Sequence, residues 1–218
     1  MLANIYGIYQ KEVAGIQFAC REGCAACCTQ SVTMTTAEGR AITAFLAGQE
    51  RKLPPLPDLG ERARPDMTTN ELAADCLAGR ESEPEAEAPW IYEPCVFLRN
   101  ERCTVYPVRP FGCRSFGSTR SCLAQGIAEV PEWLVTLNIV VSQLLEDLDR
   151  NGFWGNMNDV LAYLDKLAGG RRPEPGEACL LPTRPVPGFL VPPGEERMVN
   201  RFLEEVVRSG GLPRDFRL

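Results

Sequence analysis

The chain contains no histidine among its 218 residues. Imidazole is the commonest general base, the usual partner of a nucleophilic serine or cysteine, and the proximal ligand of globin-type haem. Its absence excludes Ser-His and Cys-His nucleophilic pairs, two-His-one-carboxylate iron sites and every zinc site with a nitrogen ligand. Any transition metal bound by this chain must therefore rest mainly on thiolates. The sequence shows no catalytic base with a defined geometry, although several carboxylates could serve as one.

Long apolar runs and an excess of basic charge are also missing. The most apolar window, residues 133–148, is interrupted by polar and charged side chains, so no segment reaches the eighteen or so apolar residues of a membrane span. Residues 1–7 lack the basic and apolar regions of a signal peptide. The 23 basic and 29 acidic side chains leave a net charge of −6, which disfavours general nucleic-acid binding. We expect a cytoplasmic protein with neither a membrane nor a nucleic-acid partner.

The apolar pattern predicts an α+β, mostly helical fold. A hydrophobic content of 44% and a charged content of 24% are typical of a globular domain. Helical spacing of apolar residues predicts helices over residues 4–16, 36–49, 131–152, 158–167 and 194–209. The second of these begins at Thr35-Thr36-Ala37-Glu38, which matches a capping box. Short strands are expected at 31–34, 94–98 and 103–106, the last two forming a β-hairpin that packs with a cysteine-ligated metal core against the amphipathic helices.

Proline and charge divide the chain further. Residues 1–170 are predicted to form the cysteine-cluster domain, with an irregular insertion at about 53–89 that holds one helical turn near 70–77 and a Glu-rich run at 80–88. Residues 171–193 contain seven prolines and predict an extended strap. We expect this strap and the helix after it, together residues 171–218, to dock on the same domain.

Ten cysteines contrast with the missing histidine, and eight of them fall in two dense blocks. The first block is Cys20, Cys24, Cys27 and Cys28, and the second is Cys95, Cys103, Cys113 and Cys122. Clustered cysteines in a reducing cytosol indicate metal or redox chemistry, and two intervening residues let both sulfurs face one ion. Adjacent cysteines cannot easily chelate one tetrahedral ion, so Cys27 and Cys28 serve two sites, or one ligates and the other packs. Cys76 and Cys179 are interpreted as small buried hydrophobic residues.

Positive charge accompanies the second block. Between residues 94 and 122 there are five arginines and one glutamate, although the whole chain is acidic. Guanidinium groups would offset the negative charge that four thiolates leave on a metal centre and lower their pKa values. We expect Arg109 and Arg114 to lie beside such a centre; binding of an anionic substrate, or simple solvation, are the alternatives.

These residues together resemble a known family. Cys20 to Cys28, Pro94-Cys95-Val96-Phe97-Leu98, Cys103-Thr104-Val105-Tyr106, Arg109-Pro110 and Cys113-Arg114-Ser115-Phe116 resemble the CxxCxxCC family of bacterial and archaeal cysteine-cluster proteins. The first pair departs from that pattern, with three residues between Cys20 and Cys24 in place of two. The resemblance implies a zinc- or iron-chelating domain over about residues 15–122. In this resemblance, seven of the eight clustered cysteines match cysteines of the family pattern: Cys20, Cys24, Cys27, Cys28, Cys95, Cys103 and Cys113. We add Cys122 as an eighth expected ligand.

Three classes of function remain open at this point. The first is a protein that chelates iron, as an iron–sulfur cluster, or zinc, with a redox or metal-handling role. The second is a structural zinc domain that presents its C-terminal helix and strap to a protein partner. The third is a cluster-dependent enzyme, because the flagellin lysine methylases resemble the same cysteine pattern; this chain shows no Gly-rich nucleotide loop to hold a methyl donor.

Overall fold

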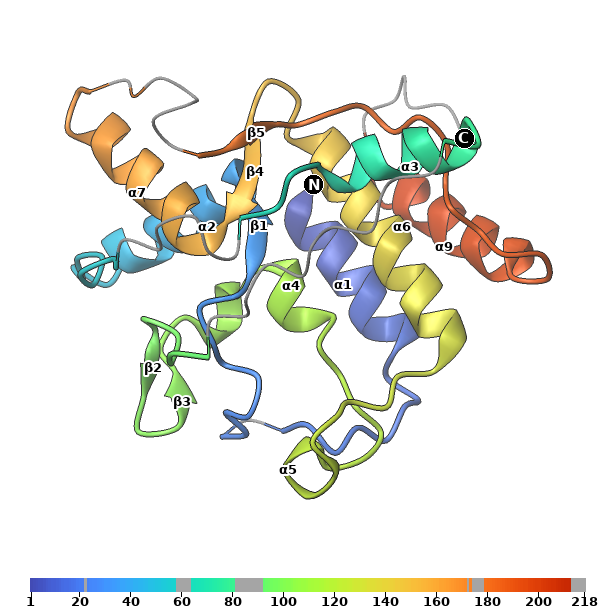
Figure 1. The fold of residues 1–218 in the computed structure, drawn as a ribbon, viewed down its shortest axis with the longest axis horizontal. Coiled ribbons are helices and arrows are strands. Elements are labelled where there is room, and N and C mark those ends of the chain that lie inside the picture. The colour runs from blue at the N-terminus through green and yellow to red at the C-terminus, as the bar shows by residue number, and fades with distance from the viewer. Residues whose placement is uncertain (22, 58–63, 81–91, 172, 174–178, 213–218) are drawn as a thin grey trace.

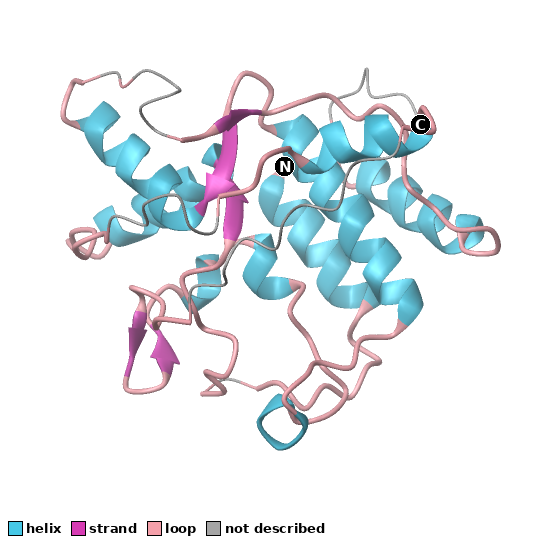
Figure 2. Ribbon diagram, viewed as in Figure 1, coloured by secondary structure: helices cyan, strands magenta, loops and turns pink. Residues whose placement is uncertain are grey.

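A computed structural model describes residues 1–21, 23–57, 64–80, 92–171, 173 and 179–212. Its helices and short antiparallel strands confirm the predicted α+β, mostly helical fold (Figures 1 and 2). Most of the Glu-rich run and the first part of the strap lie outside the described residues. Within the described part, no helix is long and apolar enough to pass through a bilayer.

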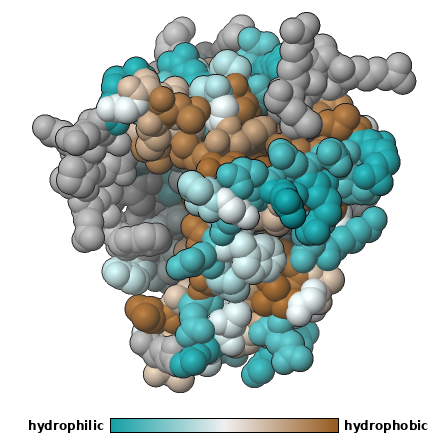
Figure 3. Space-filling view, turned by 90° about the vertical axis from the view of Figure 1, so that its right-hand side faces the viewer, coloured by the Kyte–Doolittle hydropathy of each residue, from teal (hydrophilic) through white to brown (hydrophobic). Residues whose placement is uncertain are grey.

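One half of the molecule is helical. Helices α1 (Leu2–Glu12), α6 (Glu132–Leu148) and α9 (Glu196–Arg208) share one apolar core, in which the faces of α6 and α9 are buried. Pro131 is the N-cap residue of α6, where the N–H that proline lacks would have no partner within the helix. Helix α9 packs against α1, and its outer face carries charged residues, so hydrophilic and hydrophobic residues are interspersed on the side shown in Figure 3.

The other half is built on a small sheet with the order β1-β4-β5. Strand β1 (Thr33–Thr35) pairs with β4 (Phe153–Asn156), and β4 pairs with β5 (Leu181–Pro182), both antiparallel. Helices α2 (Thr36–Ala47) and α7 (Met157–Ala168) follow β1 and β4 directly and pack on each other. Strand β4 was not predicted, because four residues are too few for an apolar alternation to be recognised.

The predicted insertion contains more structure than one turn. Helix α3 (Thr69–Leu77) begins with its own capping box, in which Thr68 and Glu71 satisfy each other's backbone N–H groups. It is tied to α6, because the Asn70 N–H donates to Oε2 of the buried Glu146 at 2.8 Å. The second carboxylate oxygen of Glu146 accepts from the Arg184 N–H, so the C-terminal end of α6 holds both α3 and the strap.

The second cysteine block folds into short elements around the lower part of the molecule in Figure 1. The predicted hairpin is present but shorter than expected, as β2 (Leu98–Arg99) and β3 (Arg102–Cys103). Asn100 and Glu101 both have positive φ, which gives the tight two-residue turn of a β-hairpin. A 3₁₀ turn η1 (Tyr106–Val108), helix α4 (Phe111–Arg114) and helix α5 (Cys122–Gln125) follow.

Candidate metal centre

Seven of the eight clustered cysteines line a single cavity of about 630 Å³. They come from the loop between α1 and β1, from the β2–β3 region and from α4: Cys20, Cys24, Cys27, Cys28, Cys95, Cys103 and Cys113. The lining also includes four aromatic side chains: Tyr6, Tyr9, Phe18 and Phe116. Segments about seventy residues apart in the sequence therefore face one another, as the cysteine pattern predicts. None of the eight clustered cysteines forms a disulfide.

The first block is a loop of two tight turns. The Cys24 N–H donates to the carbonyl of Arg21, and Gly23 in this turn has a φ of +90°, which glycine adopts without strain. The Cys28 N–H donates to the carbonyl of Ala25 and closes the second turn. The small residues between the cysteines let the backbone turn this closely, and all four cysteines of the block line the cavity.

Backbone pairing places Cys28 next to Cys95. The Cys95 N–H donates to the Cys28 carbonyl at 2.9 Å, and Thr29 and Pro94 form an isolated antiparallel bridge. The Leu98 N–H then donates to the Cys95 carbonyl, which leads the chain into the hairpin, where Leu98 is directly opposite Cys103. These backbone bonds bring Cys28, Cys95 and Cys103 to one side of the cavity.

The position of Cys113 is determined by the packing of α4 between α1 and β1. The Phe111 ring contacts the rings of Tyr6 and Tyr9 of α1, with centroids 6.3 and 4.9 Å apart, and its N–H donates to the Glu38 carboxylate at 2.7 Å. Gly112 lies flat against β1, because a Cβ there would approach the Thr33 carbonyl oxygen to 2.9 Å. Helix α4 therefore has one position between α1 and β1, and Cys113 is fixed with it.

The loop around Ser118 holds the other end of the first block. The Ala19 N–H donates to the Ser118 carbonyl at 2.8 Å, and the Ser118 N–H donates to Sγ of Cys20 at 3.3 Å. Ser118 is fully buried, and its hydroxyl accepts from the N–H groups of Arg120 and Glu129. Cys122 begins α5 a few residues later and does not line the cavity, although a charge on its sulfur would raise the pKa of Cys20.

A family model for the CxxCxxCC family, described as a "putative zinc- or iron-chelating domain", matches residues 19–133, which is more than half of the chain. The chain belongs to this family. No curated protein and no solved structure matches it. The matched region spans both cysteine blocks and the whole cavity wall that they form, so the CxxCxxCC domain here carries a metal-chelating function.

The thiols of the CxxCxxCC domain surround the cavity instead of meeting at a point. Among the residues that the structure describes, no three Cys, Asp or Glu side chains converge closely enough to hold an ion as they stand. The donor set nevertheless fits a thiolate-bound metal. Cys20, Cys95 and Cys103 each accept a bond from a backbone N–H, of Ser118, Phe97 and Val105 respectively, and such bonds stabilise the thiolate form that a metal requires.

Burial and hydrogen bonding move the thiol pKa values in opposite directions. Burial raises the pKa of Cys20, Cys95, Cys103 and Cys113 above the ordinary value, and the backbone N–H groups at the first three oppose it. The pKa of Cys28 is lowered, because the Cys27 thiol donates a hydrogen bond to it. The same bond raises the pKa of Cys27. The metal-free domain therefore holds most of these thiols protonated, with Cys28 the most readily ionised of this set.

Arg109 and Arg114 both reach the cavity, and both also hold the loop that leads to α4. The Arg114 guanidinium donates to the carbonyls of Arg109 and Pro107 and lies 4.3 Å from the Tyr6 ring centroid. Arg109 donates to the Tyr106 carbonyl and stacks on its ring at 3.7 Å. The pKa values of Cys103 and Cys113 are raised by burial, and the charge of Arg109 opposes that increase at both thiols.

The interpretation of the two isolated cysteines was wrong. Cys76 and Cys179 are exposed, and neither lines the cavity, so they are surface residues and not small buried hydrophobic ones. Sequence reasoning also missed the part that Glu38 and Ser118 play around the cavity. The capping box revealed Glu38 as a helix cap, but its bond to α4 joins residues 73 positions apart and has no local signal.

Proposed function

We propose that this CxxCxxCC domain binds iron as an iron–sulfur cluster through the cysteines of its cavity and serves in redox or metal handling. The observation that carries the proposal is that seven thiols line one cavity, with no disulfide among them. Three of these thiols accept backbone N–H bonds, and two arginines lie beside them. Hydrogen bonds and positive charge near the sulfurs are the means by which a protein stabilises a cluster and sets its potential.

The space between the thiols favours a cluster over one zinc ion. A structural zinc site closes four ligands around the ion at about 2.3 Å from each sulfur. The cavity of about 630 Å³ has seven thiols among its lining residues and is larger than one such shell needs. A polynuclear centre spreads its ligands over a larger volume and uses the same donor type. The cysteines named in the two blocks would hold it, and Arg109 and Arg114 would offset its charge.

Elemental analysis of the protein tests this proposal directly. The full chain is purified without oxygen and without added metal, and its iron, sulfide and zinc contents are measured with its visible spectrum. We expect iron with matching sulfide, and broad absorption near about 400 nm from charge transfer between thiolate and iron. Cys24→Ser is expected to lose at least half of the metal and Cys76→Ser none, because Cys76 is exposed and outside the cavity. A protein without iron, or with iron unchanged in Cys24→Ser, contradicts the proposal.

A structural zinc domain is the second candidate, and the backbone pairing favours it. The loop of the first block is already paired with the segment before β2 through backbone bonds. An ion bound by thiols from both segments would stabilise this pairing and so contribute directly to the free energy of folding. In that case the anaerobically purified chain is colourless and contains zinc, and a chelator lowers its melting temperature. A coloured protein that contains iron and little zinc excludes this candidate.

A further inference from the structure

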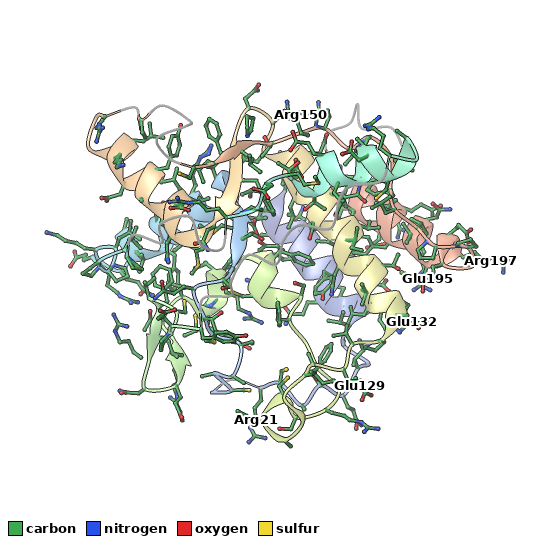
Figure 4. All side chains as sticks on the ribbon, viewed as in Figure 1. Arg21, Glu129, Glu132, Arg150, Glu195 and Arg197 are labelled. Carbon is green, nitrogen blue, oxygen red and sulfur yellow. The ribbon has the colours of Figure 1, made fainter. Side chains whose placement is uncertain are left out.

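The loop of the first block runs between two different neighbours. Figure 1 shows it passing along the lower side of the molecule from the vicinity of α5 to the vicinity of β2 and β3. At its beginning, the backbone of Ala19 is bonded to Ser118, in the segment that leads to α5. At its end, the backbone of Cys28 is bonded to Cys95, in the segment that leads to the hairpin. Arg21 lies at the lower end of the molecule, near α5 (Figure 4).

The partners of Cys28 are determined by this pairing. Its carbonyl accepts from Cys95, Cys95 is bonded to Leu98, and Leu98 is opposite Cys103. Helix α4 brings Cys113 to the same side, because Gly112 packs on Thr33, just after the first block. Backbone pairing, the hairpin register and the packing of α4 thus place these four thiols in one region of the cavity lining.

A different set of thiols surrounds Cys20. The N–H of Ser118 donates to its sulfur at 3.3 Å, and Cys122 follows four residues after Ser118, at the start of α5. Cys24 and Cys27 are separated by two alanines, a spacing that turns both sulfurs toward one ion. In the metal-free protein the Cys27 thiol donates a hydrogen bond to Cys28, so their sulfurs are neighbours, but two adjacent residues cannot easily ligate one tetrahedral ion together. The four thiols at this end of the loop therefore belong together.

We infer that the eight cysteines form two separate four-thiolate centres that divide between the adjacent residues Cys27 and Cys28. The first centre is held by Cys20, Cys24, Cys27 and Cys122. The second centre is held by Cys28, Cys95, Cys103 and Cys113. This inference rests on the proposed function, because it requires that the thiols bind metal, but it applies equally to iron–sulfur clusters and to zinc. It explains why a single cavity has more thiols than one centre uses, and why the two blocks are linked at both ends of one loop.

Metal stoichiometry of paired variants tests the division. The full-length protein is reconstituted anaerobically with ferrous iron and sulfide, and in a parallel series with zinc alone, and the metal per chain is measured. Cys122→Ser and Cys103→Ser are each expected to keep half of the wild-type metal. Combining them should remove nearly all of it, whereas Cys20→Ser with Cys122→Ser should remove only half. Cys76→Ser is the matched control and should retain the full content.

Protection against alkylation provides a second measurement, which reports on each cysteine separately. Metal-loaded Cys103→Ser is treated briefly with iodoacetamide and examined by peptide mass spectrometry. Cys20, Cys24, Cys27 and Cys122 should remain protected, while Cys28, Cys95 and Cys113 are labelled. Loss of all metal from Cys103→Ser, full retention by Cys122→Ser, or labelling of both sets together overturns the division. Failure of wild-type protein to bind either metal contradicts the proposed function instead.

Discussion

The Phe111 N–H donates to Oε1 of Glu38 across 2.7 Å and joins the beginning of α2 to the helix that carries Cys113. The same oxygen accepts from the Tyr6 hydroxyl at 2.5 Å, and Oε2 accepts from the Thr35 backbone at 2.8 Å. Burial and this carboxylate raise the pKa of Tyr6, which keeps the hydroxyl a donor at any ordinary pH. One buried carboxylate thus connects α1, α2 and α4 behind the cavity wall.

Glu38→Gln is expected to lower the free energy of unfolding by about 1–3 kcal/mol, because a neutral amide offers one acceptor oxygen where the carboxylate offers two. The bound metal should decrease with it, since the position of α4 is less well determined. Denaturant unfolding of the metal-free protein gives the stability. Glu71→Gln is the matched control: Glu71 closes the same kind of capping box in α3, is partly exposed and is remote from the cavity. An equal or larger loss in Glu71→Gln would mean that the cap alone matters.

Gly112→Ala should interfere with the seating of α4. The added Cβ would lie 2.9 Å from the backbone oxygen of Thr33 and 3.2 Å from the Val32 side chain. The contact with the oxygen cannot be relieved by a change of rotamer, because that atom belongs to the backbone of β1. We expect a loss of about 1–3 kcal/mol in stability and weaker metal binding. In Gly48→Ala the new Cβ would lie 3.5 Å from the nearest oxygen at the end of α2, so its stability should change little. Equal melting temperatures for the two variants would contradict the prediction.

Among the cavity thiols with a shifted pKa, Cys28 is expected to be the most reactive in the metal-free protein. Thiolate is the nucleophile, and the lowered pKa of Cys28 gives it a larger ionised fraction at pH 7 than Cys20, Cys95, Cys103 or Cys113, whose pKa values burial raises. A short iodoacetamide pulse followed by peptide mass spectrometry measures the order of labelling. Raising the pH should narrow the difference, because Cys28 approaches full ionisation at a lower pH than the other thiols do.

A pair of variants identifies the cause of this reactivity. Cys27→Ala removes the donor to Cys28 and should raise the pKa of Cys28, so its labelling at pH 7 slows. Cys27→Ser keeps a hydroxyl donor at the same position and should preserve more of the rate. If both variants label Cys28 as fast as the wild type does, the hydrogen bond from Cys27 is not what lowers its pKa.

The C-terminal helix is predicted to be part of the same cooperative unit as the cysteine domain. Phe202 is completely buried in the core that α9 shares with α1 and α6. Phe202→Ala should cost about 3–5 kcal/mol and lower the melting temperature in a single transition. Val207, on the same helix, is 44% exposed, so Val207→Ala should cost far less. A separate early transition in Phe202→Ala would show instead that residues 171–218 unfold independently of the rest.

Local signals in the sequence were sufficient for most of the helices. The capping box at Thr35 and Glu38 begins α2 as predicted, and the wide apolar face after Pro131 becomes α6. Both depend on contacts within a few residues, which the order of residues determines directly. The small sheet was not predicted as a whole. Strand β5 has only two residues, and its pairing partner is nearly thirty positions earlier in the chain.

The sequence by itself determined the chemistry of this protein: without histidine and with eight clustered cysteines, it could offer a metal little except sulfur. Only the tertiary structure decided which sulfurs are neighbours. Cys28 lies beside Cys95 because two backbone segments pair, and Cys113 faces the cavity because Glu38, Tyr6 and Thr33 leave α4 a single place. Such contacts join residues that are distant along the chain, and spacing alone carries no information about them, because it describes the path of the backbone only over a few residues.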